Sequence, residues 1–215
     1  MPAQPPPDVA GRVHTGAEWT EESRAAGDVV AIAASAGGLP AISAVLAALP
    51  PDLEAAVLVV QHIDPRHRSL LAEILGRRCA LPVAEARDGE RLRPGQVRVA
   101  PPDRHLLVNQ DGTLSLSQTR LVHFVRPSAD LLFESAALAY RERVIAVVLT
   151  GTGIDGRRGA AAVRQLGGTV IAQDEATSEF FGMPGAVIRS GAVDLVLPLH
   201  RIGPAITGLL AGEPA

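Results

Sequence analysis

Short runs of apolar residues alternate with helical patterns along most of this 215-residue chain. The runs at 29–33, 57–60 and 144–149 contain only Val, Ile, Leu and Ala, which is typical of strands buried on both faces of a parallel sheet. Each run is followed, after a turn, by a segment whose apolar residues recur at helical spacing. Repeated strand–helix–strand units predict an α/β fold with three layers, built on a doubly wound, mostly parallel sheet.

The expected elements cover the chain from residue 28 onward. Strands are expected at 29–33, 57–60, 144–149, 169–172 and 194–197, and helices at 39–49, 69–78, 129–140, 156–166, 184–190 and 200–210. Three shorter β-like runs lie at 97–100, 106–108 and 114–116, and Asp111-Gly112 between the last two is a strong hairpin signal. We therefore expect a small antiparallel excursion in this middle part of the chain.

The length of the chain indicates one domain. We expect residues 28–215 to form it and residues 1–27 to be a disordered tail or the remnant of a linker. Three consecutive prolines, Pro5, Pro6 and Pro7, cannot occupy the interior of a helix.

Composition and charge exclude several classes of protein. The formal net charge is −3 and aromatic residues make up 3% of the chain, whereas nucleic-acid-binding domains usually carry a basic excess and stacking aromatic side chains. Cys79 is the only cysteine and no Cys/His cluster has zinc spacing, so we expect no disulfide, metal or other cofactor. No transmembrane-length apolar run and no secretory signal is visible, so we expect a cytoplasmic protein.

Ser35 lies between the first expected strand and the first expected helix, within the small-residue sequence AASAGG at 33–38. Ligands of open α/β sheets bind outside the carboxyl ends of the strands, which is where this serine falls. Its small neighbours leave the hydroxyl accessible, and amides at the start of the helix could face an oxyanion. A serine that only caps the helix is the alternative. A phosphate-binding loop is disfavoured because neither glycine-rich phosphate motif is present.

His62 directly follows the second expected strand, and Asp155 follows the strand at 144–149 across a glycine-rich turn. A neutral imidazole can take a proton from a serine hydroxyl, and a carboxylate can orient that imidazole. The alternatives are a strand-end histidine bonded to backbone and an aspartate that caps the helix beginning at Gly156. The other histidines in the tail, in a loop or near the antiparallel region fit the role of base less well: His14, His67, His105 and His123.

Together the three residues predict a Ser-His-Asp triad, because all fall at carboxyl ends of expected parallel strands. Their order along the chain, Ser35, His62, Asp155, differs from the Ser-Asp-His order of the α/β-hydrolase fold, and no G-x-S-x-G elbow is present. The sequence therefore favours a serine hydrolase of another type than the common lipases and esterases.

Seven motifs resemble, in the same order, those of bacterial chemotaxis protein-glutamate methylesterases. They are ASAGG at 34–38, VQH at 60–62, DGE at 88–90, VAPPD at 99–103, RPSAD at 126–130, LTGTGIDG at 149–156 and FGMP at 181–184. The resemblance covers nearly all of the chain from residue 28 to about residue 210. It implies a CheB-type catalytic domain that hydrolyses glutamate methyl esters on chemoreceptor signalling helices, and family members can also deamidate receptor glutamines.

The resemblance also implies roles for individual residues. Ser35 corresponds to the nucleophile, His62 to the base and Asp155 to its partner, the same three residues that strand-end placement selects. The family's oxyanion positions fall on Ala36 and Thr152, where this chain departs from a usual Thr and a usual Met. Side chains that shape the pocket at these positions would alter substrate preference, whereas backbone donors would be unaffected.

Arg126 and Met183 follow the family pattern and are candidates to line a substrate groove. Each has a structural alternative. Arg126 can be a structural cation near Asp130, and the FGMP sequence can simply start a helix.

The usual enzyme of this family carries an N-terminal phosphoacceptor receiver domain, for which the residues before 28 are too few. Either that domain is missing from this sequence, or the protein is a stand-alone version controlled in another way. Besides chemoreceptor helices, a separate receiver protein or a methyltransferase is then a candidate partner. Two other functions stay open: a non-enzymatic signalling or docking module on the same fold, and a hydrolase of another protein ester or amide.

Overall fold

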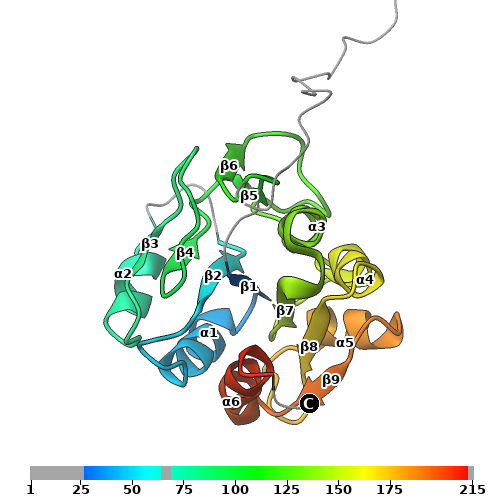
Figure 1. Ribbon diagram of the computed structural model, residues 1–215. Coiled ribbons are helices and arrows are strands. Elements are labelled where there is room, and N and C mark those ends of the chain that lie inside the picture. Colours follow the sequence, from blue (N-terminus) through cyan, green and yellow to red (C-terminus); the bar gives the residue numbers. More distant parts are fainter. Residues whose placement is uncertain (1–26, 64–68, 213–215) are drawn as a thin grey trace, which may run out of the picture.

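The computed structural model describes residues 27–63 and 69–212 (Figure 1). The first strand begins at Asp28, where the predicted domain starts. The predicted tail, residues 1–27, lies outside the described residues except for Gly27.

A seven-stranded sheet forms the middle layer, and the pairings between its strands are parallel. Its order is β3-β4-β2-β1-β7-β8-β9. The strands are β1 (Asp28–Ala34), β2 (Ala55–Gln61), β3 (Val83–Glu85), β4 (Val97–Val99), β7 (Val144–Val148), β8 (Thr169–Gln173) and β9 (Leu195–Leu197). β1 and β2 pair from Asp28 with Ala55 to Ala34 with Gln61, so their carboxyl ends lie side by side.

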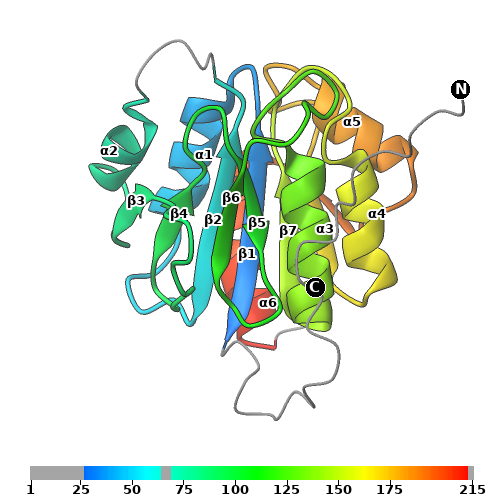
Figure 2. The ribbon, with the colours of Figure 1, turned by 90° about the horizontal axis from the view of Figure 1, so that it is seen from above.

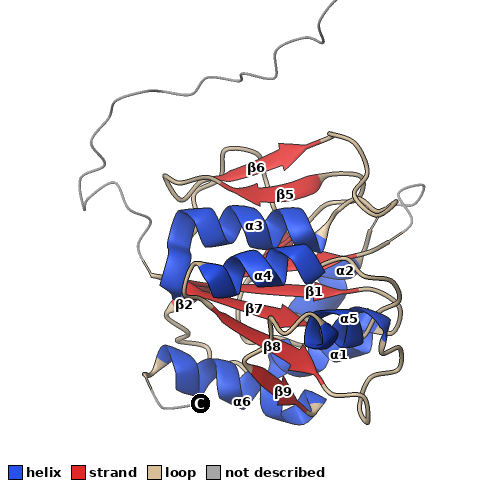
Figure 3. Cartoon of the chain, turned by 90° about the vertical axis from the view of Figure 1, so that its right-hand side faces the viewer, coloured by secondary structure: helices blue, strands red, loops and turns tan. Residues whose placement is uncertain are grey.

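Helices cover both faces of the sheet (Figures 2 and 3). One face packs against α1 (Gly38–Ala47), α2 (Leu71–Gly76) and α6 (Leu199–Leu210). The other carries α3 (Ala129–Tyr140), α4 (Arg157–Gln165), α5 (Gly182–Arg189) and the antiparallel hairpin of β5 (His105–Val108) and β6 (Leu114–Ser117). The short 3-10 helix η2 (Arg141–Arg143) joins α3 to β7. In the described part of the chain, no helix has both the length and the apolar character needed to cross a membrane.

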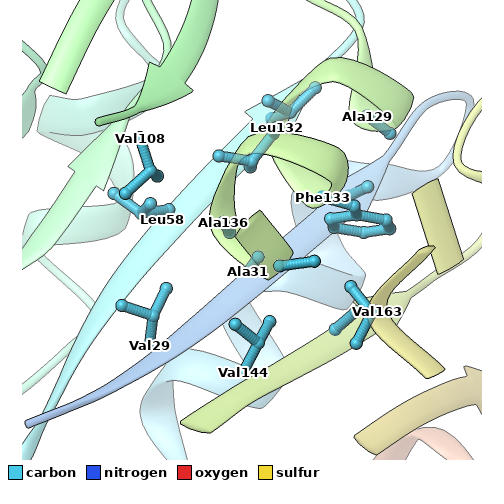
Figure 4. Packing of buried hydrophobic residues seen from close by; sticks show 14 of the residues in the cluster. Val29, Ala31, Leu58, Val108, Ala129, Leu132, Phe133, Ala136, Val144 and Val163 are labelled. Carbon is cyan, nitrogen blue, oxygen red and sulfur yellow. The ribbon is translucent and has the colours of Figure 1, made fainter. Parts of the chain in front are cut away.

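Alternate residues of β1 point into two separate hydrophobic clusters. Val29 and Ala31 pack with α3, where Phe133 supplies a large buried ring (Figure 4). Val30 and Ile32 pack with α1 and α6. Burial on both faces explains why the strand contains no polar side chain after Asp28.

From β1 the chain first builds one half of the sheet, beginning with β2 on one edge of β1, and later builds the other half, beginning with β7 on the opposite edge. Such a reversal of strand order is a topological switch point, and ligands of open α/β sheets bind outside the carboxyl ends of the strands there. Ser35 follows β1, His62 follows β2 and Asp155 follows β7. The architecture therefore gathers the three predicted residues at one edge.

The predicted three-layer α/β architecture is confirmed, and so is the β5–β6 hairpin, whose turn contains Gly112 with a φ of 77°. The prediction for 97–100 is wrong: β4 pairs in parallel with β2 and β3 and belongs to the main sheet. β3 has no counterpart among the predicted strands. It is three residues long, and two of its side chains are exposed, so it carries little apolar signal.

Candidate active site

Ser35 lies directly after β1, where its backbone is bonded on both sides. Its N–H donates to the carbonyl of Thr150 at 3.0 Å, and its carbonyl accepts from the N–H of Gly38 at 2.9 Å. The N-cap of α1 is Gly37, with a left-handed φ of 73°. The alternative role of Ser35 as the cap of this helix therefore does not apply.

Two glycines allow close approaches around Ser35. A Cβ on Gly151 would lie 2.8 Å from Ser35 Cβ and 2.5 Å from Met183 Sδ. A Cβ on Gly38 would lie 2.0 Å from Gln61 Oε1. Cβ atoms essentially never approach other atoms this closely, so a side chain at Gly151 would press on the loop that carries Ser35, and one at Gly38 would displace the side chain of Gln61.

His62 turns its imidazole toward Asp155. Its Nε2 lies 2.9 Å from Oδ2 of that carboxylate. The backbone N–H of His62 donates to the carbonyl of Ala34 at 3.1 Å, which fixes this residue to the strand end that carries Ser35. With Nε2 bonded to the carboxylate, Nδ1 is the ring nitrogen that can take up a proton.

The carboxylate of Asp155 is buried, and each oxygen accepts two hydrogen bonds. Oδ1 accepts from the Ser128 hydroxyl at 2.8 Å and the Asp130 N–H at 3.2 Å. Oδ2 accepts from the Ala129 N–H at 2.6 Å, in addition to His62. Asp155 therefore caps the start of α3 from another part of the chain, where the helix dipole favours negative charge.

This environment keeps Asp155 ionised. Burial alone raises the pKa of its carboxyl, but the hydrogen bonds from His62 and from the amides of α3 outweigh it, so the pKa lies below its ordinary value of 3.8. The alternative role of Asp155 as the cap of α4 does not apply, because the N-cap of that helix is Gly156.

Two buried glutamines, Gln61 and Gln173, support the site, although the sequence analysis names neither as a candidate site residue. Gln61 donates through Nε2 to the carbonyls of Ser35 at 2.7 Å and His62 at 3.1 Å. Thr150 donates its N–H to Gln173 Oε1 at 2.8 Å. A polar residue that ends an otherwise apolar strand, as Gln61 ends β2 and Gln173 ends β8, is a usable signal because buried polar groups require partners.

The two candidate oxyanion positions border Ser35. Ala36 is half-buried before α1, and its carbonyl lies 3.1 Å from the hydroxyl of Thr150. Thr152 is exposed, next to Gly151, whose N–H and carbonyl are both hydrogen-bonded to the segment 180–183. The role of both residues stays a prediction.

Both candidate groove residues make contacts within the protein, and their role in a groove stays a prediction. Arg126 donates through Nε and Nη2 to Asp103 Oδ1 at 2.9 and 2.5 Å, and through Nη1 to the carbonyls of residues 118–119. The carboxylate that pairs with it is thus Asp103 and not Asp130. Met183 is fully buried against Gly151, so its side chain supports the loop from behind.

The structure describes two of the four other histidines that were considered as the base. His14 and His67 lie outside the described residues. His105 is fully buried with Nε2 3.1 Å from the carbonyl of Arg120, and burial lowers its pKa below the ordinary 6.5. His123 lies close by, with Nε2 3.1 Å from Oδ2 of Asp130.

His123, Asp130 and Asp155 bring possible metal ligands within 4.8 Å of one another. Their carboxylate oxygens already accept hydrogen bonds from the chain itself, including one from the N–H of Gly159 to Asp130 Oδ1 at 2.8 Å. This cluster is therefore a hydrogen-bonded network that joins α3, α4 and the candidate triad.

Comparison with known proteins gives one consistent result. A family model described as CheB methylesterase matches residues 30–206. Protein-glutamate methylesterase/protein-glutamine glutaminase 2 of Caulobacter vibrioides is 44% identical over 208 residues, and a protein-glutamate methylesterase/protein-glutamine glutaminase of Symbiobacterium thermophilum is 45% identical over 179 residues. The crystal structure of the Thermotoga maritima CheB methylesterase catalytic domain has a TM-score of 0.82 and 40% identity, covering 86% of this chain and 99% of that one.

The two curated relatives are longer than this chain. The matches cover 95% and 83% of this chain, but only 60% and 49% of the Caulobacter and Symbiobacterium proteins. The chain thus spans between half and three fifths of their length.

Proposed function

This chain belongs to the CheB methylesterase family, and from that premise we propose that it is a serine hydrolase that removes methyl groups from glutamate methyl esters of chemoreceptors. We include deamidation of glutamine side chains, the second activity in the names of its relatives. The observation that carries the proposal is the 2.9 Å contact between His62 Nε2 and Asp155, at the sheet edge where Ser35 follows β1.

In the proposed first step, Ser35 attacks the ester carbonyl. The ionised Asp155 keeps a proton on Nε2 of His62, so the lone pair stays on Nδ1 and accepts the hydroxyl proton as the new C–O bond forms. The negative charge that develops on the carbonyl oxygen needs nearby donors, and backbone amides at Ala36 and Thr152 are the proposed ones.

In the second step, the bond to the methoxy oxygen breaks and His62 returns its proton to it, so methanol leaves. Water then attacks the acyl-enzyme with His62 again as base, which regenerates Ser35 and leaves a glutamate carboxylate. For a glutamine substrate the leaving group is ammonia and the remaining steps are the same.

The proposed partners follow from the substrate. We propose that chemoreceptor signalling helices carry the modified side chains. The enzyme would then act in the cytoplasm. A separate receiver protein or a methyltransferase is the proposed regulator.

Methanol release tests the activity. Receptor membranes carrying labelled methyl esters are incubated with wild-type protein and with Ser35→Ala, beside a small ester substrate. We expect release by the wild type and a loss of about 10⁶-fold in Ser35→Ala, because triad members act as a unit. Ser190→Ala, at an exposed serine after α5, is the matched control.

Each other outcome points elsewhere. Wild-type release that persists in Ser35→Ala overturns the nucleophile. Hydrolysis of small esters alone favours a hydrolase of another protein ester, and inactivity with retained receptor binding favours a docking module.

A further inference from the structure

The loop between β6 and α3 contains a tight turn of unusual sequence. Val122 and Val125 exchange two backbone hydrogen bonds, of 2.9 and 3.2 Å. The two residues between them, His123 and Phe124, both have positive φ, 50° and 65°. Turns with this backbone favour Asn-Gly, because a bulky side chain at positive φ crowds its own backbone.

Side chains hold this turn against the body of the protein. His123 Nε2 lies 3.1 Å from Oδ2 of Asp130, a fully buried residue whose other oxygen accepts the N–H of Gly159 in α4 at 2.8 Å. At the other end of the loop, Arg126 is bonded to Asp103. The turn is therefore braced from two directions.

Phe124 itself faces the solvent. Its side chain is 94% exposed, in a chain with only four phenylalanines, whereas Phe133 is fully buried in the core. An exposed ring adds nothing to the packing of the core. Strained backbone is retained where its surroundings determine it, and such residues cluster at functional sites.

The turn lies beside the candidate triad, since ligand atoms of His123 and Asp155 are within 4.8 Å of each other. Two further apolar side chains are exposed at this edge. They are Ile154, next to Asp155 in the chain, and Phe180, whose carbonyl accepts a hydrogen bond from Gly151. The edge thus combines a polar centre with exposed apolar side chains around it.

We propose that Phe124 is a specificity-determining residue, whose ring packs on apolar side chains of the protein helix that carries the esterified glutamate. This inference rests on the proposed function. His123 of the turn adjoins Asp155, Asp155 contacts His62, and in the proposed mechanism the ester lies beyond His62 at Ser35, so a small ester does not reach the ring. A helix does, because its side chains on one face follow each other at about 5–6 Å.

Two esters separate recognition from chemistry. One is N-acetyl-glutamate γ-methyl ester amide. The other is a synthetic helical peptide with the same ester and leucines three, four and seven residues away on the same face. In Phe124→Ala, kcat/KM for the peptide falls about tenfold, through KM, as for an aromatic anchor of an interface. Turnover of the small ester stays within about twofold of wild type, because it makes no contact with the ring.

Two further variants serve as controls. Phe124→Leu restores most of the peptide activity, because an apolar side chain is kept. Leu138→Ala removes an exposed apolar side chain of α3, 62% exposed, and leaves both activities unchanged.

Binding tests the ring without turnover. The fluorescently labelled peptide is titrated into Ser35→Ala and into the double variant Ser35→Ala/Phe124→Ala, and Kd rises about tenfold in the second. If the wild type hydrolyses neither ester while this difference in Kd remains, the proposed function fails and the role of Phe124 stands. Any of three results overturns the inference. The first is that Phe124→Ala changes neither the Kd nor the KM for the peptide. The others are that the peptide does not bind Ser35→Ala, or that Phe124→Ala loses turnover equally on both esters.

Discussion

The candidate triad and the turn at 122–125 are neighbours built on opposite principles. At the triad, polar groups are buried, and both oxygens of Asp155 accept two hydrogen bonds each. In the turn, an apolar ring stands almost fully in solvent on a backbone that disfavours it. Parallel strand pairing positions the first, whereas the His123–Asp130 contact and the Arg126–Asp103 pair position the second.

This difference suggests that chemistry and recognition are separable in the molecule. A change at the triad should affect every ester equally, because each passes through the same bond-breaking steps. A change in the turn should affect only substrates large enough to touch it.

His62→Ala should lower turnover of both the small ester and the helical peptide by about 10⁶-fold, because the base and the proton donor are lost together. Steady-state methanol release measures this. His200→Ala, at an exposed histidine of α6, should keep wild-type rates. A loss confined to the peptide would place His62 in recognition and break the comparison.

Asp155→Asn should lower turnover of both esters by about 10⁴-fold, because an amide no longer holds the imidazole in the required tautomer. It should also destabilise the fold, since the NH₂ group that replaces one carboxylate oxygen cannot accept the backbone hydrogen bond, from Ala129 or from Asp130, that this oxygen accepts.

The pH dependence of that destabilisation has a definite sign. The pKa of Asp155 is lower in the folded chain than its ordinary 3.8, so the unfolded chain binds the proton more readily. The stabilisation is therefore complete above pH 3.8 and is lost as pH falls through the folded pKa. The difference in Tm between the wild type and Asp155→Asn should shrink below about pH 4. A difference that is constant with pH would contradict this account.

Gly151→Ala should slow both esters by about 100-fold, because the new Cβ displaces the loop that carries Ser35. We expect a loss of about 1–3 kcal/mol in the free energy of unfolding from the overpacked contact with Met183. Gly76→Ala is the matched control, since a Cβ there meets Val83 at an ordinary 3.6 Å. Wild-type kinetics in Gly151→Ala would show that the close approach is not needed for catalysis.

The sequence carries a signal for where the candidate triad lies in the fold, but none for the turn. Ser35, His62 and Asp155 fall at the ends of apolar runs, and parallel pairing brings such ends together. The turn gives no such signal, because His123 and Phe124 are not turn-forming residues. Its conformation depends on Asp130, which α4 buries from far along the chain.

The same distinction explains the other differences. Whether a short strand such as β4 joins the main sheet depends on its neighbour β2, not on its own residues. Two of the four donors to Asp155 are backbone amides at the start of α3, which have no sequence signature. Motif positions also do not distinguish a surface side chain from a buried one, as the burial of Met183 shows.

His105 should make the stability of the protein depend on pH. Its Nε2 lies 3.1 Å from the carbonyl of Arg120, in the loop that leads to the turn. Burial lowers its pKa below 6.5, and its buried Nδ1 has no hydrogen-bond partner among the described residues. The unfolded chain therefore gains a proton near pH 6.5 before the folded chain does. Stability should fall below that pH by at most about 1.4 kcal/mol per unit. Urea unfolding at pH 7.5 and 5.5 should show a smaller decrease in His105→Gln. An unchanged decrease would assign it to other groups.

The smallest effect on the free energy of unfolding is expected from Phe124→Gly. This variant separates the cost of the strained backbone from any packing of the ring. A left-handed residue other than glycine costs about 1–2 kcal/mol. Glycine's freedom in the unfolded chain costs about 0.5–1 kcal/mol. The free energy of unfolding should therefore stay the same or rise by at most about 1.5 kcal/mol, as measured in urea, while hydrolysis of the helical peptide falls as in Phe124→Ala. A loss of stability would mean that the ring packs on the protein itself. The turn would then be part of the structural support of the triad, and the separation between chemistry and recognition would not hold.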